Sequence, residues 1–517
     1  MEKKLKKIIV YIALFIILVL FLLTVIYTSS ISATLEEKTI INQTTVLDLL
    51  LSFVVCYLII NAVNIINRKF SKNMQNILKV LGIILYCVAS IFWIKYTQAV
   101  PVGDQKTIND DAIKVLNNGL SSLKDNKYYQ INPQQLGIVY FISILYRLFN
   151  TTNYRLLQVF NLISNLLIFY AFYKINKDII KGTSKSNILL YILFFMYIPL
   201  CLLTTFVYAD YIAMTFAIWS IYFLMYYFKN AENIEKENRK NIKYIIFSTI
   251  LMSISLILKI NFIIYFIAAI IYFILNITKN SKFRKKYLIS LLIYSILILM
   301  VYRLFNIYAY KKIDYDYNKA TPANSYFYMA MSETSRANGW YNGSVAEDVY
   351  NNPVQAKIKY KAMLNERIKY MCIHPLYAIK FYSKKIVSLW CEPTFQSIWY
   401  NMPFQVYDYS SYMASNKVFN SLYYAKLHHI IIIIQKAIQL LVYYIVFRYL
   451  YDNRKNIDNI DNSIILVLTI FIGGFLFYNL WEGKSRYVIP YFLILYLALC
   501  KYNINDKKIK YLCRFNK

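Results

Sequence analysis

The sequence predicts an all-α polytopic membrane protein with about twelve transmembrane helices. Of its 517 residues, 59% are hydrophobic and 16% are charged, whereas a soluble protein has about 25% charged residues. Apolar runs recur along the chain with lengths of roughly 20 residues, which is what a helix needs to span the hydrocarbon core of a bilayer. With 10 Gly and 9 Pro, the chain has too few turn residues to fold so many apolar segments into one soluble core.

The charge distribution supports this class and indicates a location. The chain has 58 basic and 26 acidic residues, a net charge of +32, which on a soluble protein would favour a nucleic-acid partner. Here Lys and Arg lie in short segments between apolar runs, as topology signals facing an anionic cytoplasmic leaflet do. We therefore expect a lipid bilayer and no nucleic acid as partner. The surplus of Ile, Asn, Lys, Tyr and Phe is typical of AT-rich genomes, which favours a bacterial plasma membrane.

The first apolar run, residues 8–28, follows four lysines. It resembles a signal peptide with a cleavage site near Ala33, but it is longer than the usual signal core, so we expect an uncleaved helix. The positive-inside rule then places both termini in the cytoplasm. The predicted spans are 8–28, 46–66, 77–97, 154–173, two within 187–228, two within 243–277, 287–309, 428–449, 463–481 and 488–501.

Residues 135–149 are apolar but short. If they crossed the membrane, the basic loops 174–185, 229–243 and 279–286 would all face outward. We therefore expect an interfacial or re-entrant helix there. The expected organisation is an N-terminal helix pair (1–76), a membrane core (77–309) with an external loop (100–153), one α-rich extracytoplasmic domain (310–427), and C-terminal helices with a basic cytoplasmic tail (428–517).

Polar residues near the membrane are costly and usually functional, and in this topology most of them gather at the outer face. They are Asp104, Asp110, Asp111, Asp210, Lys259, Arg303, Glu482, Lys484 and Arg486. Most of them have a simpler interpretation. Asp110 and Asp111 suit a solvated loop, Asp210 a hairpin turn, and Lys259 and Arg303 a position among lipid headgroups. Glu482 and Arg486 are spaced for a helical ion pair.

The cysteines and histidines give no clear metal site. The three histidines match no zinc-ligand spacing, and no cofactor is certain. Carboxylates at the outer face are suitable ligands for a divalent metal, although no ligand set has a recognisable spacing. Cys372 and Cys391 share one hydrophilic segment, where an extracytoplasmic location permits a disulfide.

Acids and cations together at the outer membrane surface suit sugar transfer from a lipid-phosphate donor. A carboxylate can act as general base on an acceptor hydroxyl. Arg and Lys can hold the donor phosphate and stabilise the charge of the leaving group. The sequence has no G-x-x-x-x-G-K-[ST] loop for a nucleotide phosphate, so a nucleotide-driven reaction has no visible support.

Several motifs, in order along the chain, carry a family resemblance. They are Gly103-Asp104-Gln105, Asp110-Asp111-Ala112, the segment 128–137, Val207-Tyr208-Ala209-Asp210, Leu258-Lys259-Ile260-Asn261, His374-Pro375, Trp390-Cys391-Glu392-Pro393 and the segment 481–487. The chain resembles GT-C superfamily glycosyltransferases over roughly residues 77–500. The nearest branch is glycosyltransferase family 39, which includes protein O-mannosyltransferases and lipid A aminoarabinose transferases, in its Gram-positive form. The first two spans would be an N-terminal addition.

The resemblance implies a helical membrane domain, juxtamembrane helices in the first external loop and an external domain. It implies transfer, with inversion, from an undecaprenyl-phosphate sugar to a cell-wall polymer, glycolipid or protein outside the cytoplasm. Asp104 would be the base, with Asp110 or Asp111 as alternatives. The residues expected to bind substrate are Tyr129, Gln135, Tyr208, Asp210, Lys259, Arg303, Glu482, Lys484, Arg486 and Tyr487. Among these, Lys259, Arg303 and Arg486 would hold the phosphate, and Glu482 would orient Arg486 or the sugar.

The motifs depart from the family at two places. The usual Asp-Glu pair is Asp104-Gln105 here, and a common Pro-Pro step is Pro133-Gln134, which leaves the donor contacts near it open. Other functions also stay open. A lipid-linked sugar flippase would usually have internal repeats, helices broken by Gly or Pro, and polar residues near the midplane. This chain shows no repeat, few helix breakers, and charges biased toward the outer face. A polysaccharide polymerase or ligase would use a lipid-diphosphate donor, and a silent scaffold would tolerate changes at the outer charges.

Overall fold

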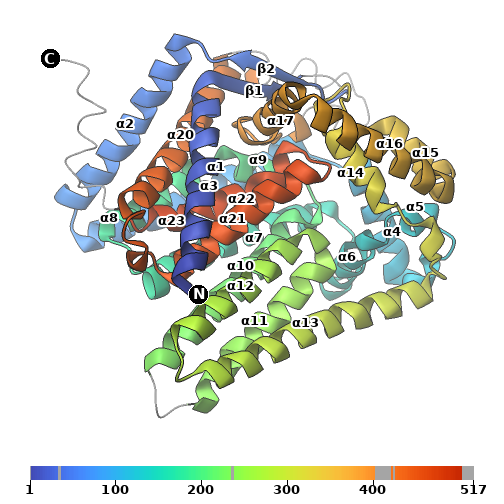
Figure 1. Cartoon of the computed structure of the whole chain (residues 1–517), viewed down its shortest axis with the longest axis horizontal. Helices are drawn as coiled ribbons and strands as arrows, with labels where there is room; N and C mark the ends of the chain where they lie inside the picture. Colours follow the sequence, from blue (N-terminus) through green and yellow to red (C-terminus); the bar gives the residue numbers. More distant parts are fainter. Residues whose placement is uncertain (1, 33–35, 234–237, 402–420, 423–425, 503–517) are drawn as a thin grey trace.

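The computed structural model describes residues 2–32, 36–233, 238–401, 421–422 and 426–502. The cleavage site considered near Ala33, the end of the predicted external domain and most of the expected basic tail lie outside the described residues. The described chain is a bundle of helices, and toward one end of it lie the short helices α4 (Asp104–Asn118), α5 (Lys127–Ile131), α14 (Ala323–Met331) and α15 (Gly343–Asn351) (Figure 1).

In this part of the chain ten helices are long and apolar enough to cross a membrane. They are α1 (Glu2–Ile26), α2 (Val46–Lys69), α3 (Lys72–Thr97), α7 (Tyr154–Lys174), α10 (Ala209–Asn233), α11 (Asn238–Leu258), α12 (Ile263–Lys279), α13 (Arg284–Lys312), α20 (Lys426–Asn453) and α21 (Asn462–Leu480). An eleventh candidate is the pair α8 (Ser184–Met196) and α9 (Ile198–Leu202), which bends by 47°. The many apolar helices indicate a multi-pass membrane protein, as predicted.

The predicted count is about twelve spans, and the described residues contain ten or eleven candidates. The difference lies in the last predicted span, 488–501. The corresponding apolar helix, Ser485–Leu499, is shorter than the spans above and contains α22 (Ile489–Leu493) and α23 (Leu495–Leu499). Both pieces are buried among the other helices.

Two β-strands depart from the all-α prediction. Strands β1 (Tyr27–Ile31) and β2 (Thr39–Gln43) pair antiparallel, with Ile31 opposite Thr39. Their Thr and Ile side chains suit a strand, but the segment lies between two long apolar runs, and no element is predicted for it from the sequence. The hairpin joins α1 to α2, and the turn between its strands carries Glu37.

The shorter helices lie in two groups of connecting segments. The first group is α4 (Asp104–Asn118), α5 (Lys127–Ile131) and α6 (Leu136–Leu148), and the second is α14 (Ala323–Met331), α15 (Gly343–Asn351), α16 (Pro353–Ile373) and α17 (Pro375–Trp390). Figure 1 shows most of both groups on the right, with α17 nearer the top centre. With 13 residues, α6 is about 20 Å long, too short for a hydrocarbon core of about 30 Å. This length agrees with the predicted interfacial helix.

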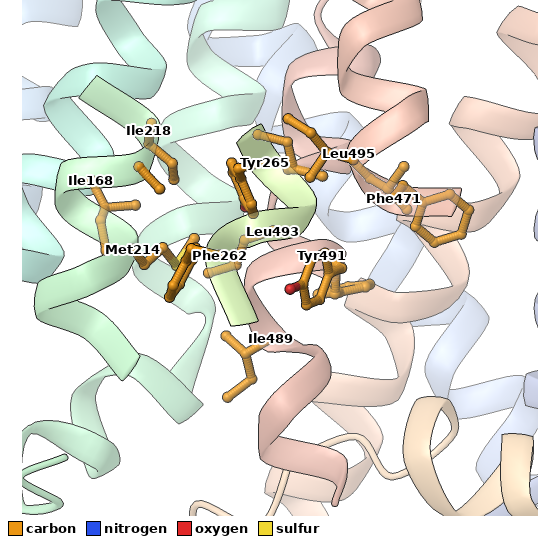
Figure 2. Packing of buried hydrophobic residues seen from close by; sticks show 14 of the residues in the cluster. Ile168, Met214, Ile218, Phe262, Tyr265, Phe471, Ile489, Tyr491, Leu493 and Leu495 are labelled. Carbon is orange, nitrogen blue, oxygen red and sulfur yellow. The ribbon is translucent and has the colours of Figure 1, made fainter. Parts of the chain in front are cut away.

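The core beneath this end is apolar and tightly packed. Figure 2 shows Met214 of α10, Tyr265 of α12 and Tyr491 of α22 among its buried side chains. A Cβ atom on Gly474 of α21 would lie 2.1 Å from the Tyr491 ring, so only glycine lets these elements approach so closely. The N-terminal helix belongs to the same core: α1 buries its apolar face and packs against α20 and α21.

Candidate functional site

A cavity of about 1000 Å³ opens at the end of the bundle where the connecting segments meet. We call it the site cavity. Its walls come from segments far apart in the sequence: the turn of the N-terminal hairpin, residues 102–105 and 128–135, 206–209, 258–261, 320–350, 399–400 and 481–487. Of the polar residues expected at the outer face, the cavity wall brings together Asp104, Lys259, Glu482, Lys484 and Arg486.

A first charged group forms on one side of the site cavity around Asp210. The Asp210 carboxylate, near the N-terminus of α10, pairs with the Lys259 ammonium and, at 2.8 Å, with the Arg486 guanidinium. The helix dipole also favours a negative charge at this position. The three side chains are at most 13% exposed, and two cations against one carboxylate leave the group positive. Lys259 and Arg486 line the cavity, with Asp210 behind them.

Aromatic rings surround the Arg486 guanidinium. It lies 4.5 Å from the ring centre of Phe206, 5.3 Å from Tyr208, 5.0 Å from Tyr400 and 4.7 Å from Tyr487. Its Nε donates a hydrogen bond of 2.8 Å to the Tyr400 hydroxyl. These cation–π contacts and the hydrogen bond fix its orientation.

The ion pair considered between Glu482 and Arg486 is not found among the described ion pairs, because Arg486 pairs with Asp210 instead. The helical segment Ser485–Val488 begins only after Glu482, so the spacing of four residues does not place the two side chains on one helix face.

A second charged group centres on Glu37, which sequence reasoning missed. Glu37 is 1% exposed, and its carboxylate accepts from Lys484 Nζ at 2.8 and 2.9 Å, from Gln396 Nε2 at 2.8 Å, and from Arg336. Burial alone would raise the pKa of Glu37, but the charges of Lys484 and Arg336 outweigh it and lower that pKa. This group also carries two cations and one anion. In the sequence, Glu37 is one of two adjacent glutamates, and nothing local distinguishes it from Glu36.

Glu482 lies in the wall of the site cavity and is 7% exposed. Within the described structure its Oε1 atom is buried without a hydrogen-bond partner. Burial and the nearby charge of Glu37 raise its pKa despite the cations around it. The segment that carries Glu482 is held by Lys385 of α17, whose buried ammonium donates to the carbonyls of Ala330 (2.9 Å), Asn479 (3.0 Å) and Trp481 (3.0 Å). Lys385 was not singled out in the sequence.

Of the three predicted loop aspartates, Asp104 alone lines the site cavity. It stands exposed at the start of α4, and no ion pair of Asp104 occurs in the described part of the chain. Asp110 is exposed outside the cavity lining. Asp111 is buried and binds Lys114 at 2.7 Å and the Asn126 amide at 3.3 Å, so its carboxylate ties α4 to the segment before α5.

The other residues expected to bind substrate also include some that line the site cavity and some that do not. Gln135, Tyr208 and Tyr487 line the site cavity, and Gln135 Nε2 donates to the Tyr208 hydroxyl at 2.5 Å. Tyr129 is fully buried outside the lining, and its neighbour Tyr128 lines the cavity instead. Arg303 is exposed on α13 and also absent from the lining, which agrees with its alternative interpretation as a headgroup contact.

The disulfide considered between Cys372 and Cys391 is absent, because both cysteines are free. Cys372 precedes α17 and Cys391 follows it, and this helix of 16 residues is about 24 Å long. Such a separation is far beyond the reach of a disulfide. Cys391 is buried and accepts a hydrogen bond from the Thr24 hydroxyl at 3.4 Å.

Among the described residues, no group of three or more His, Cys, Asp or Glu side chains is arranged to hold a metal ion. The arrangement instead offers an exposed carboxylate, a buried carboxyl group and two positively charged groups around one cavity. Neither a protein-family model, nor a curated protein, nor a solved structure matches the chain.

Proposed function

We propose that this chain is an inverting GT-C-type glycosyltransferase of a bacterial plasma membrane. It moves a sugar from a polyprenyl-phosphate donor to an acceptor outside the cytoplasm. The observation that carries the proposal is the single cavity that holds Asp104, free of ion pairs among the described residues, together with the cations Lys259, Lys484 and Arg486. The ordered motifs that resemble glycosyltransferase family 39 support the same reaction class.

In the proposed reaction, Asp104 accepts the proton of an acceptor hydroxyl as its oxygen bonds to the anomeric carbon of the sugar. The bond from that carbon to the phosphate oxygen breaks, and the lipid phosphate leaves with the electron pair. Lys259, Lys484 and Arg486 stabilise the negative charge that develops on this phosphate. Attack from the face opposite the leaving group inverts the anomeric configuration.

The location of the cations suits a lipid carrier. Lys259 lies in the break between the two apolar helices α11 and α12, and Tyr208 directly precedes α10. A phosphate bound here would stand at the membrane boundary, so the polyprenyl chain would remain in the bilayer. Glu482, Gln135 and Tyr487 would contact the sugar or the acceptor from the cavity wall.

Asp104→Asn in the full-length protein tests the proposal. We expect it to reduce transfer from a polyprenyl-phosphate sugar by about a hundredfold or more, the usual contribution of a general base. Asp110→Asn is the matched control, because it removes an exposed carboxylate of the same helix outside the cavity, and it should leave transfer unchanged. Full activity of the Asp104→Asn variant would refute the assignment of the base.

A lipid-diphosphate polymerase or ligase is a second candidate, favoured by one observation. The second positive group, formed by Lys484 and Arg336 with Glu37, offers cations for a further phosphate. Turnover measured with matched monophosphate and diphosphate carriers separates the two functions. Our proposal requires the monophosphate carrier to be the better donor.

A further inference from the structure

We infer that Glu37 is a positioning residue, which holds the Lys484 ammonium at the wall of the site cavity for an anionic group of the substrate. The N-terminal hairpin is thereby part of the site, although the family resemblance begins only after it. The inference rests on the proposed function for the identity of the anion, a lipid phosphate.

The contacts of Glu37 join four separate segments. Lys484 comes from the connection between α21 and α22, Arg336 from the connection between α14 and α15, and Gln396 from the residues after α17. Gln396 is itself held, since its backbone N–H donates to the buried carboxyl of Glu392, which also accepts from the Ser485 hydroxyl at 3.2 Å. The position of Glu37 is therefore determined from several sides.

The hairpin that carries Glu37 is anchored along both strands. The Ser29 N–H donates to the Cys391 carbonyl at 3.1 Å, and the Thr39 N–H donates to the Arg336 carbonyl at 2.8 Å. At the base of the hairpin, Lys436 of α20 donates to the Tyr27 carbonyl at 3.2 Å and to the Thr28 hydroxyl at 2.6 Å. These bonds give the turn a fixed place at the cavity.

The contacts of Lys484 leave part of its hydrogen-bonding capacity for a ligand. Both oxygens of Glu37 accept from the ammonium, which has three N–H donors, so one donor has no hydrogen-bond partner among the described residues and lies beside the cavity. A free lysine side chain would lose considerable rotamer entropy on binding an anion, and the pair with Glu37 removes much of that cost in advance. The charged and titratable groups around Lys484 are Glu37, Arg336, Glu482, Arg486, Tyr341 and Tyr400.

Without the carboxylate of Glu37, Lys484 would stand buried near Arg336 and Arg486 with no ion-pair partner among the described residues. Such an ammonium either loses its proton or turns away, and both changes remove its donor from the cavity wall. Burial lowers the pKa of Lys484, but nearby Tyr400 and Glu37 outweigh it and raise that pKa. Loss of Glu37 should therefore make phosphate binding weaken at a lower pH than in the wild type.

The test measures binding of a short-chain polyprenyl phosphate to the full-length protein in phosphatidylcholine nanodiscs. We expect Glu37→Gln to weaken binding by about tenfold, as loss of an orienting partner does in other sites, and to move the alkaline loss of binding to lower pH. Glu36→Gln is the matched control, because Glu36 is an exposed residue of the same turn. It should bind like the wild type over the whole pH range.

A double-mutant cycle distinguishes positioning from a general structural role. If Glu37 acts through Lys484, then Glu37→Gln causes no further loss in a Lys484→Met background. Equal losses in both backgrounds, or wild-type binding by Glu37→Gln, would overturn the inference. If Glu37→Gln does not fold, Glu37→Asp replaces it, and its shorter side chain should weaken binding in the same direction.

Sugar transfer, measured on the same samples, separates this inference from the proposed function. Phosphate binding that depends on Glu37, without any sugar transfer by the wild type, would reject the proposed function and leave the inference standing. Transfer by the wild type that is insensitive to Glu37→Gln would reject the inference alone. No phosphate binding by the wild type would reject the inference.

Discussion

At the scale of single residues, the buried carboxyl group of Glu482 should make the stability of the protein depend on pH. Its pKa is raised mainly by burial, so the folded protein holds this proton more tightly than the unfolded chain does. The tighter proton binding stabilises the folded state at acid pH, and this stabilisation is lost as the pH rises through the raised pKa of Glu482. Glu482→Gln stays neutral, so its thermal stability relative to the wild type should increase as the pH rises above about 4, the ordinary pKa of a glutamate.

Thermal unfolding of both proteins in one detergent at several pH values checks this prediction. Glu36→Gln is a control, since Glu36 is exposed and its replacement should give a small difference at every pH. A Glu482→Gln variant that loses stability as the pH rises would contradict the account of Glu482.

Lys385 gives a second prediction at this scale. Its ammonium is the donor to three carbonyls in the interior, and a buried acceptor without a partner costs about 1–3 kcal/mol. Lys385→Met should therefore lower the free energy of unfolding by about 2 kcal/mol or more, measured as a fall in melting temperature. The adjacent Lys384 is exposed, and Lys384→Met should change the melting temperature little. Equal stability of the two variants would count against the role of Lys385.

The site was partly predictable at this scale. Asp104, Tyr208, Lys259, Glu482 and Arg486 stand in motifs at the ends of apolar runs, where a charged side chain is conspicuous. Glu37 and Lys385 were not recognisable, because each is one of several like residues in a hydrophilic segment. Only the folded chain shows that their side chains are buried against partners distant in sequence.

At the scale of elements, the contact between α6 and α11 makes a third prediction. A Cβ atom on Gly137 would lie 1.8 Å from the backbone oxygen of Ile257 in α11. Backbone cannot move aside as a flexible side chain can, so Gly137→Ala should cost about 1–3 kcal/mol of stability. Gly343, at the start of α15, has no other atom within 4 Å of its added Cβ, and Gly343→Ala should be tolerated. Similar melting temperatures for the two variants would contradict the close packing of α6.

The sequence predicts an element well where the length of an apolar run alone determines whether the helix can cross the membrane. The run at 135–149 was too short to cross a bilayer, and α6 has that short length in the structure. The hairpin of β1 and β2 was missed because five-residue strands between two long apolar runs leave no clear period in the sequence. Its stability comes from bonds to α20 and to residues 336 and 391, which lie far away in the chain.

At the scale of the whole molecule, a fourth prediction concerns which segments of the chain face the cytoplasm. The basic segments at 174–185 and 279–286 should face the cytoplasm, and the site cavity should face outward. Reporter fusions after residues 180 and 281 should show cytoplasmic activity, and a fusion after residue 342, beside the site cavity, should show the opposite. A cytoplasmic signal from all three positions would contradict the proposed topology.

The composition was sufficient to predict a helical multi-pass protein, because 59% hydrophobic residues in long runs leave few alternatives. The number of spans was harder, because α8 and α9 bend and the last apolar helix is short. The cavity itself depends on how eight separate segments pack together, and no local pattern contains that information.

The central claim is that this cavity binds a lipid phosphate between a base and a set of cations. The most direct measurement is an experimental structure of the full-length protein in nanodiscs with a non-reactive polyprenyl-phosphate sugar analogue. We predict the phosphate in contact with Lys259, Lys484 or Arg486, and the sugar facing Asp104. A phosphate bound elsewhere on the protein, with the cavity empty, would contradict the account.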